Sequence, residues 1–182
     1  MSVVYNLVKM NKLSLERQAQ VIRVLCEGNS IRSTARITDT AINTVVSLLK
    51  RVGDACAKYQ DIHLRNLACR AIQCDEIWSF CYAKEKNVPE NKQGRFGYGD
   101  VWTWTALDAD TKLVPSWTVG LRNASYAFFF IRDLRSRLAN RVQLTTDGHR
   151  AYLTAVEDVF GSEVDYAMLV KLYGHEREQV VR

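Results

Sequence analysis

Two adjacent carboxylates interrupt an apolar and aromatic stretch of the chain. The segment IQCDEIWSF covers residues 72–80 and carries Asp75 and Glu76 near its centre. A buried carboxylate is costly unless it is paired or binds a metal ion. Side chains alternate between the two faces of a strand, so a strand here would point Asp75 and Glu76 to opposite sides. Two interpretations of Asp75 follow: a metal ligand, or an exposed strand residue.

A second acidic motif lies 72 residues further along, where VQLTTDGHRAY predicts a strand at 142–146 that ends at Asp147. Asp-Gly is a common turn dipeptide, so Asp147 alone also fits a plain turn. On neighbouring strands, however, two aspartates would supply the carboxylate oxygens that Mg²⁺ prefers. Paired divalent ions can activate an attacking hydroxyl and stabilise the leaving oxygen of a phosphodiester. We therefore predict that Asp75 and Asp147 are catalytic ligands of Mg²⁺ or Mn²⁺, and that Glu76 is structural.

The segments around these acids predict a mixed sheet. Aromatic and β-branched residues indicate a first strand from Ala71, and further strands at 101–105, 113–119, 142–146 and 164–172. Helices are expected from Asn123 or Ser125, and over 150–160. The first three strands fit an antiparallel meander, and strands joined through helices are parallel. The first and fourth strands should be neighbours, an order that matches a ribonuclease H-like fold.

Three helical patterns precede the sheet. The first begins after Ser14, a potential N-cap, and the second covers about 30–37. The third begins near Asp39 or Thr40, with an apolar stripe of Ala41, Val45, Leu48, Leu49 and Val52. This order is typical of a helix-turn-helix, whose last helix contacts DNA bases. A helical cap or a dimerisation arm with a solvated basic face is the alternative.

The predicted DNA-binding residues combine polar and basic side chains. Polar groups near the start of the third helix suit base contacts, whereas arginines and lysines suit phosphates. They are Arg32, Arg36, Thr40, Asn43, Thr44, Ser47, Lys50 and Arg51. The isolated His63 is interpreted as a surface or packing residue.

Charge is concentrated in the same part of the chain. The 182 residues are 47% apolar and 25% charged, with a net charge of +5 and a pI of about 9.0. Between Lys12 and Arg70, ten basic residues stand against five acidic ones, which equals the excess of the whole chain. No apolar run approaches the roughly 20 residues that a membrane span needs, and the N-terminus lacks a signal-peptide pattern. Nucleic acid is the partner that this distribution favours.

The spacing of the five cysteines does not suit a metal site. They are Cys26, Cys56, Cys69, Cys74 and Cys81, and no Cys-x-x-Cys pair occurs. An odd count without such spacing predicts free thiols in a reducing cytoplasm. The predicted organisation is an extension at 1–9, a helix-turn-helix domain at 10–56, a helical linker at 57–70 and a catalytic domain at 71–182. The fold class is therefore α+β.

Several motifs resemble the Insertion Sequence 1 family of bacterial transposases. They are QCDEIWSF, GYGDVWTWTALDADTKLVPSW, RVQLTTDGHRAYL and, in the helical part, EGNSIRSTARITDTAINTVVSLL. The resemblance implies a DDE transposase that uses Mg²⁺ or Mn²⁺ to cut and join double-stranded DNA at the ends of a transposable element. It implies self-association, a place in the bacterial cytoplasm with the nucleoid, and neither a membrane nor a small-molecule substrate. By this match Asp75 and Asp147 are the first two catalytic acids.

The third acid departs from the family pattern. The family's glutamate lies on a helix well beyond the fifth strand, whereas here only GHEREQVVR follows, with Glu176 and Glu178 as weak candidates. We therefore expect a truncated copy of the enzyme. Two alternatives to an active transposase remain. One is an inactive DNA-binding protein that inhibits transposition, and the other is a nuclease of the same fold acting on RNA or junction DNA.

Overall fold

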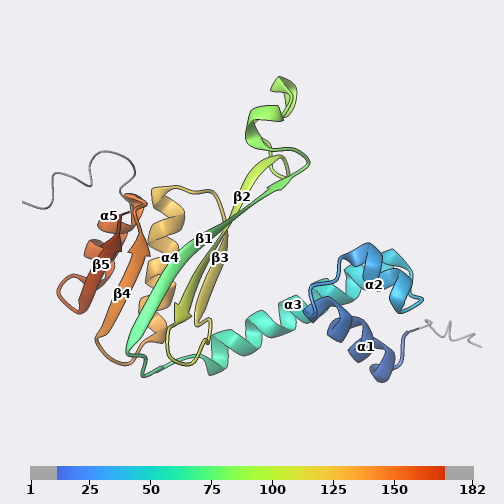
Figure 1. Ribbon diagram of the computed structural model, residues 1–182, viewed down its shortest axis with the longest axis horizontal. Coiled ribbons are helices and arrows are strands. Elements are labelled where there is room, and N and C mark those ends of the chain that lie inside the picture. The colour runs from blue at the N-terminus through green and yellow to red at the C-terminus, as the bar shows by residue number, and fades with distance from the viewer. Residues whose placement is uncertain (1–11, 171–182) are drawn as a thin grey trace, which may run out of the picture. The chain divides into compact units, whose positions relative to one another are not determined.

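Three helices open the described part of the chain, which covers residues 12–170 of the computed structural model. They are α1 (Leu15–Cys26), α2 (Ile31–Ile37) and α3 (Ile42–His63) (Figure 1). The chain divides into two units, Met1–Gln60 and Asp61–Arg182. Helix α3 continues without a break to His63, so the predicted helical linker at 57–70 is helical in its first half.

Local capping explains where the first helices begin. The Ser14 hydroxyl accepts a hydrogen bond from the Arg17 N–H at 3.3 Å, which confirms the predicted N-cap of α1. Ser30 caps α2 in the same way, accepting from the Ser33 N–H at 3.1 Å. Each cap satisfies a backbone donor that the first turn of a helix leaves unpaired.

The core of the helical unit is small and is centred on Val21, Val45 and Leu48. The prediction for α3 was wrong at two positions, since Ala41 is exposed and Leu49 is 42% exposed. A straight helix turns only one narrow face toward its partners. Residues 45, 48 and 52 share that face, whereas Leu49 lies to one side of it and Ala41 precedes the helix, which begins at Ile42.

The second unit is built on a five-stranded mixed sheet. Its strands are β1 (Ala71–Cys81), β2 (Gly99–Asp108), β3 (Ser116–Gly120), β4 (Val142–Asp147) and β5 (Val164–Leu169). Two helices connect the last three strands: α4 (Ala124–Arg137) lies between β3 and β4, and α5 (Ala151–Phe160) lies between β4 and β5. The strand order is β3-β2-β1-β4-β5, with β1 between β2 and β4 (Figure 1). The α+β class and the neighbouring first and fourth strands are confirmed.

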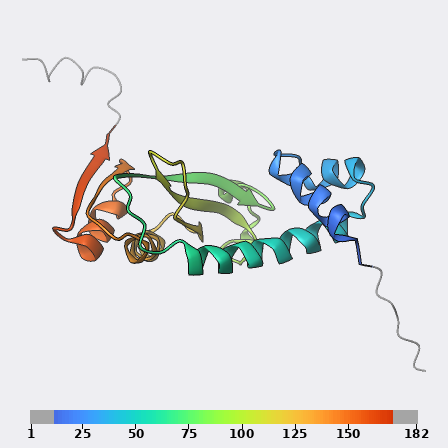
Figure 2. The ribbon, with the colours of Figure 1, turned by 90° about the horizontal axis from the view of Figure 1, so that it is seen from below.

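The directions of the strands also follow the prediction. The pairs β1–β2 and β2–β3 are antiparallel, whereas β1–β4 and β4–β5 are parallel. Both helices pack on one side of the sheet (Figure 2). The core between them contains Ile72, Trp104 and Leu144 from the sheet and Phe130 and Tyr152 from the helices, all at most 1% exposed.

The third strand is shorter than predicted. Strand β3 begins at Ser116, not at residue 113. The Leu113 carbonyl instead accepts a hydrogen bond from the Asp108 N–H at 2.8 Å, closing a turn. Pro115 has no N–H to donate to a ladder, so regular pairing starts only after it. The strand lies at the edge of the sheet, where such a start is tolerated.

An acidic residue on α4 ties that helix to β3. Asp133 accepts hydrogen bonds from the Ser116 hydroxyl at 2.6 Å and from Arg137 Nε at 2.7 Å. Burial raises the pKa of Asp133, but the hydrogen bonds from Arg137 and Ser116 outweigh burial and hold it below the usual range. A lowered pKa in the folded state means that the carboxylate stabilises the fold above its unfolded pKa of about 3.9.

We therefore expect acid to weaken the sheet unit through Asp133. Its contribution should be lost as the pH falls below about 4 toward the folded pKa. In urea unfolding between pH 5 and pH 2.5, Asp133→Asn should reduce this pH dependence, whereas Asp158→Asn, at an exposed position of α5, should leave it as in the wild type. Equal slopes for both variants would contradict the assignment.

Within residues 12–170, no helix is both long and apolar enough to cross a membrane.

Candidate functional site

The two predicted catalytic aspartates lie on neighbouring strands. Asp75 is in the middle of β1, and Asp147 is the last residue of β4. These strands run parallel, and their last aligned pair is Cys74 with Thr146. Asp75 and Asp147 are the next residue on each strand. The sheet therefore brings together two acids that are far apart in the sequence.

The alternation of side chains puts both aspartates on the same face. Cys74 and Thr146 are buried toward the helices, so the residue that follows each of them belongs to the opposite face. Asp75 is exposed there, and one of its carboxylate oxygens accepts the Glu76 N–H at 2.8 Å. The side chain of Asp147 is 42% exposed. Both carboxylates are thus open to a ligand from solvent.

Glu76 belongs to the helix-covered face and has an ion-pair partner there. Its side chain is 1% exposed, and one oxygen accepts a hydrogen bond from Arg122 Nε at 2.8 Å. Arg122 also donates from Nη2 to Asp147 at 3.2 Å, and its guanidinium lies 5.0 Å from the centre of the Trp102 ring. One arginine therefore connects the buried glutamate to the exposed aspartate. No local sequence pattern predicts the role of Arg122. It follows β3 in the chain, and it meets Glu76 and Asp147 only because the folded sheet brings their strands beside it.

The second oxygen of Glu76 faces an unusually polar part of the core. Glu76 Oε1, Tyr152 Oη and His149 Nε2 are all buried, and none has a hydrogen bond of good geometry among the described residues, although the Tyr152 hydroxyl interacts with the Glu76 carboxylate. Burial raises the pKa of Tyr152, with Cys74 and Glu76 adding to the effect, so the phenol stays protonated. His149 is held by its own N–H, which donates to Asp147 at 3.0 Å. This hydrogen bond closes the turn that follows Asp147.

The donor chemistry of the aspartate pair fits a hard divalent cation. Carboxylate oxygens are the ligands that Mg²⁺ uses, commonly with one or two protein carboxylates and substrate phosphates completing the shell. Asp75 and Asp147 would hold the ion. Within residues 12–170, no group of three or more His, Cys, Asp or Glu side chains is arranged as a metal site. The weak candidates for a third acid, Glu176 and Glu178, lie outside the described residues.

The helical unit exposes most of the residues predicted to bind DNA. On α2, Arg32 and Arg36 are exposed one turn apart, and on α3 the side chains of Asn43, Thr44, Ser47, Lys50 and Arg51 are exposed. Positions four and seven apart share a helix face. The first turns of α3 therefore expose three polar side chains, and Lys50 and Arg51 follow them on the same helix.

Thr40 differs from the others. It precedes α3, is 9% exposed, and its hydroxyl donates to the Thr38 carbonyl at 3.0 Å. Its N–H donates to the Ala35 carbonyl at 2.9 Å, while Asp39 between them has a φ of 45°. Thr40 therefore shapes the turn between α2 and α3, and its hydroxyl already has a partner.

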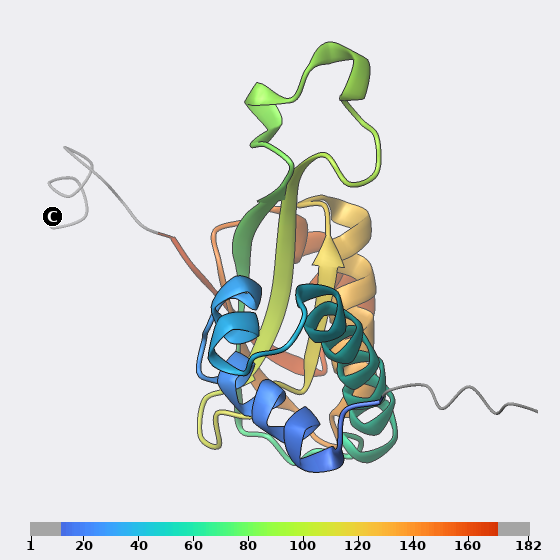
Figure 3. The same ribbon diagram turned by 90° about the vertical axis from the view of Figure 1, so that its right-hand side faces the viewer.

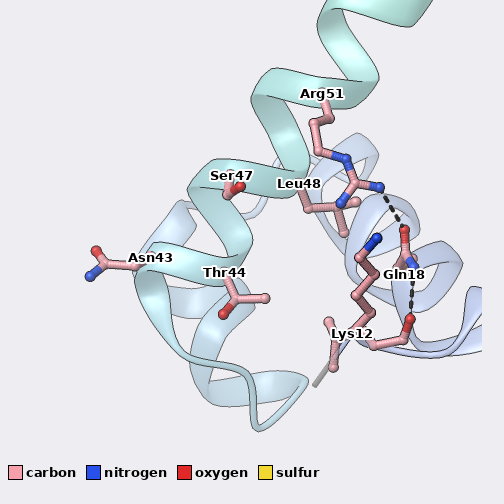
Figure 4. A pocket seen from close by; sticks show the side chains of 8 residues that line it. Lys12, Gln18, Asn43, Thr44, Ser47, Leu48 and Arg51 are labelled. Carbon is pink, nitrogen blue, oxygen red and sulfur yellow. Dashed lines mark hydrogen bonds between the residues drawn. The ribbon is translucent and has the colours of Figure 1, made fainter. Parts of the chain in front are cut away.

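A shallow hollow beside α3 adds two residues that the pattern did not single out. Lys12 and Gln18 line it with Asn43, Ser47 and Arg51. Figure 4 shows the ends of Lys12, Gln18 and Arg51 gathered together, and Asn43 pointing away from them. Arg51 Nη2 donates to Gln18 Oε1 at 3.2 Å, which orients the guanidinium. Lys12 and Arg51 thus present two cations beside the polar start of the helix.

Comparison with known proteins gives no relative for this chain. No protein-family model matches it, and no curated protein matches it significantly.

Proposed function

We propose that the protein is a DDE transposase, similar to the Insertion Sequence 1 family, that binds the ends of a DNA element and acts on them with a divalent metal. One observation carries this proposal: Asp75 and Asp147 follow the last aligned pair of two neighbouring parallel strands, with Asp75 exposed and Asp147 half-buried. Carboxylates on one exposed face are what a metal-dependent phosphodiester reaction needs.

The layout of the sheet supports the same proposal. An antiparallel meander followed by two parallel strands, in the order β3-β2-β1-β4-β5, is compatible with a ribonuclease H-like domain. In this proposal the first acid lies on the central strand and the second at the end of its parallel neighbour. The helices on one side leave the aspartate face free for DNA.

The residues of this chain would divide the work as follows. Asp75 and Asp147 hold Mg²⁺ or Mn²⁺, which supplies charge for the attacking and leaving oxygens when it is bound. Arg122 orients the Asp147 carboxylate through its Nη2 contact at 3.2 Å. Glu76, paired with the same guanidinium, fixes the position of Arg122 from the core side.

The helical unit would select the DNA. Exposed Asn43, Thr44 and Ser47 at the start of α3 suit base edges in the major groove. Arg32, Arg36, Lys50 and Arg51 suit phosphates, which position the protein and strengthen binding without reading the sequence.

We expect two kinds of variant in this unit to behave differently. Asn43→Ala should weaken binding to the preferred duplex roughly 5- to 150-fold, since a good base contact contributes about 1–3 kcal/mol. Arg36→Gln should weaken binding to all duplexes and reduce the slope of log K against log salt by about 0.9.

The measurement is a fluorescence-anisotropy titration of the full chain at several salt concentrations, with the duplex chosen by selection from a random pool. Arg23→Gln, at an exposed position of α1, is the control and should match the wild type. Unchanged affinity in both test variants would remove α2 and α3 from the interface.

A second candidate function is DNA binding without catalysis, as an inhibitor of transposition. The ion pair between Arg122 and Asp147 favours it, because a resident guanidinium already compensates one of the two aspartates. The two functions are separated by incubating the protein with element-end DNA and Mn²⁺. Nicked or joined products support the transposase, whereas tight binding without any product supports the inhibitor.

A further inference from the structure

The connection between β1 and β2 is long and folded. We call residues 82–98 the β1–β2 arm. It contains two short turns of 3₁₀ helix, Glu85–Asn87 and Glu90–Lys92. Figure 3 shows it projecting past the other strands of the sheet. Neither the paired aspartates nor the helix-turn-helix accounts for it.

Specific contacts hold the β1–β2 arm in one shape. At its base, the Glu85 N–H donates to Asp100 Oδ1 at 3.0 Å, and the Asp100 N–H donates back to Glu85 Oε2 at 3.2 Å. Further out, Val88 is only 4% exposed, and Gln93 Nε2 donates to its carbonyl at 3.1 Å. The arm thus has a small interior of its own, and these contacts hold its tip in a defined position.

The tip exposes a phenylalanine completely. Phe96 has a relative exposure of 104%. It lies between Gly94 and Gly97, whose φ angles of +69° and +86° are in the region that side chains rarely adopt. The Tyr98 N–H donates to the Arg95 carbonyl at 3.2 Å, closing the turn below the ring. A tight glycine turn therefore displays an arginine and a phenylalanine next to each other.

The remaining surface of the β1–β2 arm contains basic side chains that form cation–π contacts with aromatic rings. Four basic residues stand against two acidic ones over residues 82–98, and one of the acids, Glu85, is used at the base. Lys92 Nζ lies 4.5 Å from the centre of the Tyr82 ring and 5.1 Å from that of Tyr98. The two tyrosines meet edge to face at 5.1 Å.

We propose that the β1–β2 arm is a second DNA-binding element, in which Phe96 stacks on an unpaired or unstacked base and Arg95 binds a neighbouring phosphate. This proposal rests on the proposed function in DNA processing. Aromatic side chains bind bases through their faces, and apolar wedges enter between base steps where the duplex opens. Adjacent cations hold the phosphates on either side.

The chemistry of the arm favours DNA over a second protein. The buried centre of a protein interface is depleted in lysine and glutamate. Here Lys92 lies over the rings of Tyr82 and Tyr98, and the fully exposed Phe96 is flanked in the sequence by Arg95 and Gly97. An isolated ring beside cations suits a base with its phosphates.

The test compares two duplexes that differ by one unpaired 2-aminopurine, using the full chain. Wild-type protein should bind the duplex with the unpaired base roughly 5- to 150-fold more tightly than the paired one, and should quench its fluorescence, since one base stack contributes about 1–3 kcal/mol. Phe96→Ala should lose this preference and the quenching, and Phe96→Trp should keep both. Phe129→Ala is the matched control, because Phe129 is also exposed and has Arg132 beside its ring, but lies on α4.

The outcomes separate the two proposals. If wild-type protein binds neither duplex, the proposed function fails. If it binds both and Phe96→Ala retains the wild-type preference and quenching, the role of the β1–β2 arm is overturned while the proposed function stands. If Phe96→Ala alters the sedimentation mass and leaves DNA binding unchanged, the arm joins copies of the protein, and the DNA proposal is wrong.

Discussion

Asp75→Asn and Asp147→Asn should each lower Mn²⁺-dependent nicking of DNA by at least about a thousandfold. Asparagine keeps the size of the side chain but removes the charge that a hard cation requires. A bound metal contributes several kcal/mol to the stabilisation of a phosphodiester transition state, and each 1.36 kcal/mol is worth about tenfold in rate. DNA binding should remain, because the residues proposed to bind it belong largely to the helical unit.

The control for this pair is Asp165→Asn. Asp165 is an exposed aspartate at the start of β5, and it pairs with Arg141. Its variant should nick DNA at the wild-type rate. Nicking that survives in Asp75→Asn or Asp147→Asn would mean that the activity arises elsewhere or comes from a contaminating nuclease.

Replacing Arg122 should have the largest effect on stability among the charged residues around the aspartates. The Glu76 side chain is 1% exposed, and Arg122 Nε pairs with it at 2.8 Å. Removing one member of a buried ion pair costs about 3–5 kcal/mol, because the remaining charge is left uncompensated. Arg122 is one-third exposed, so solvent reduces this cost, and we expect Arg122→Gln to lose about 2–3 kcal/mol.

Urea unfolding followed by tryptophan fluorescence measures this effect selectively, since all four tryptophans belong to the sheet unit. Arg122→Lys should recover part of the loss by keeping the charge. Arg141→Gln, which removes an exposed pair with Asp165 and hydrogen bonds to the carbonyls of Ser162 and Val164, leaves no buried charge behind and should cost only about 1 kcal/mol. An equal loss of unfolding free energy in the Arg122 and Arg141 variants would show that the buried contact with Glu76 stabilises the fold no more than a surface ion pair.

The elements and their order were predictable because local patterns determine them. Ser14 and Asn123 begin helices by accepting backbone N–H groups, at 3.3 Å and 3.1 Å, and both are visible as caps in the sequence. Aromatic and β-branched residues indicated the strands, and the connecting helices indicated which strands run parallel. From these rules the position of Asp75 beside Asp147 could be expected before any coordinates.

Tertiary contacts explain what the sequence did not reveal. Arg122 meets Glu76 and Asp147 across 46 and 25 residues of sequence, and no local pattern encodes such a meeting. The exposure of Leu49 depends on how α3 is rotated about its axis, and a short apolar stripe in the sequence does not determine that rotation. The glycines of the β1–β2 arm indicate a turn, but only the contact of Gln93 with the Val88 carbonyl shows that the arm has an interior of its own.

The proposed metal site can be tested directly by cutting the protein backbone with Fe²⁺ bound in place of Mg²⁺. With ascorbate and peroxide, hydroxyl radicals form at the ion and cleave nearby peptide bonds, so the fragments locate the site independently of enzymatic activity. We expect cleavage next to Asp75 and Asp147, which excess Mg²⁺ or Mn²⁺ should suppress and which should be absent from the two asparagine variants. Cleavage at other positions only, or none in the wild-type protein, would contradict the assignment of these aspartates to a metal.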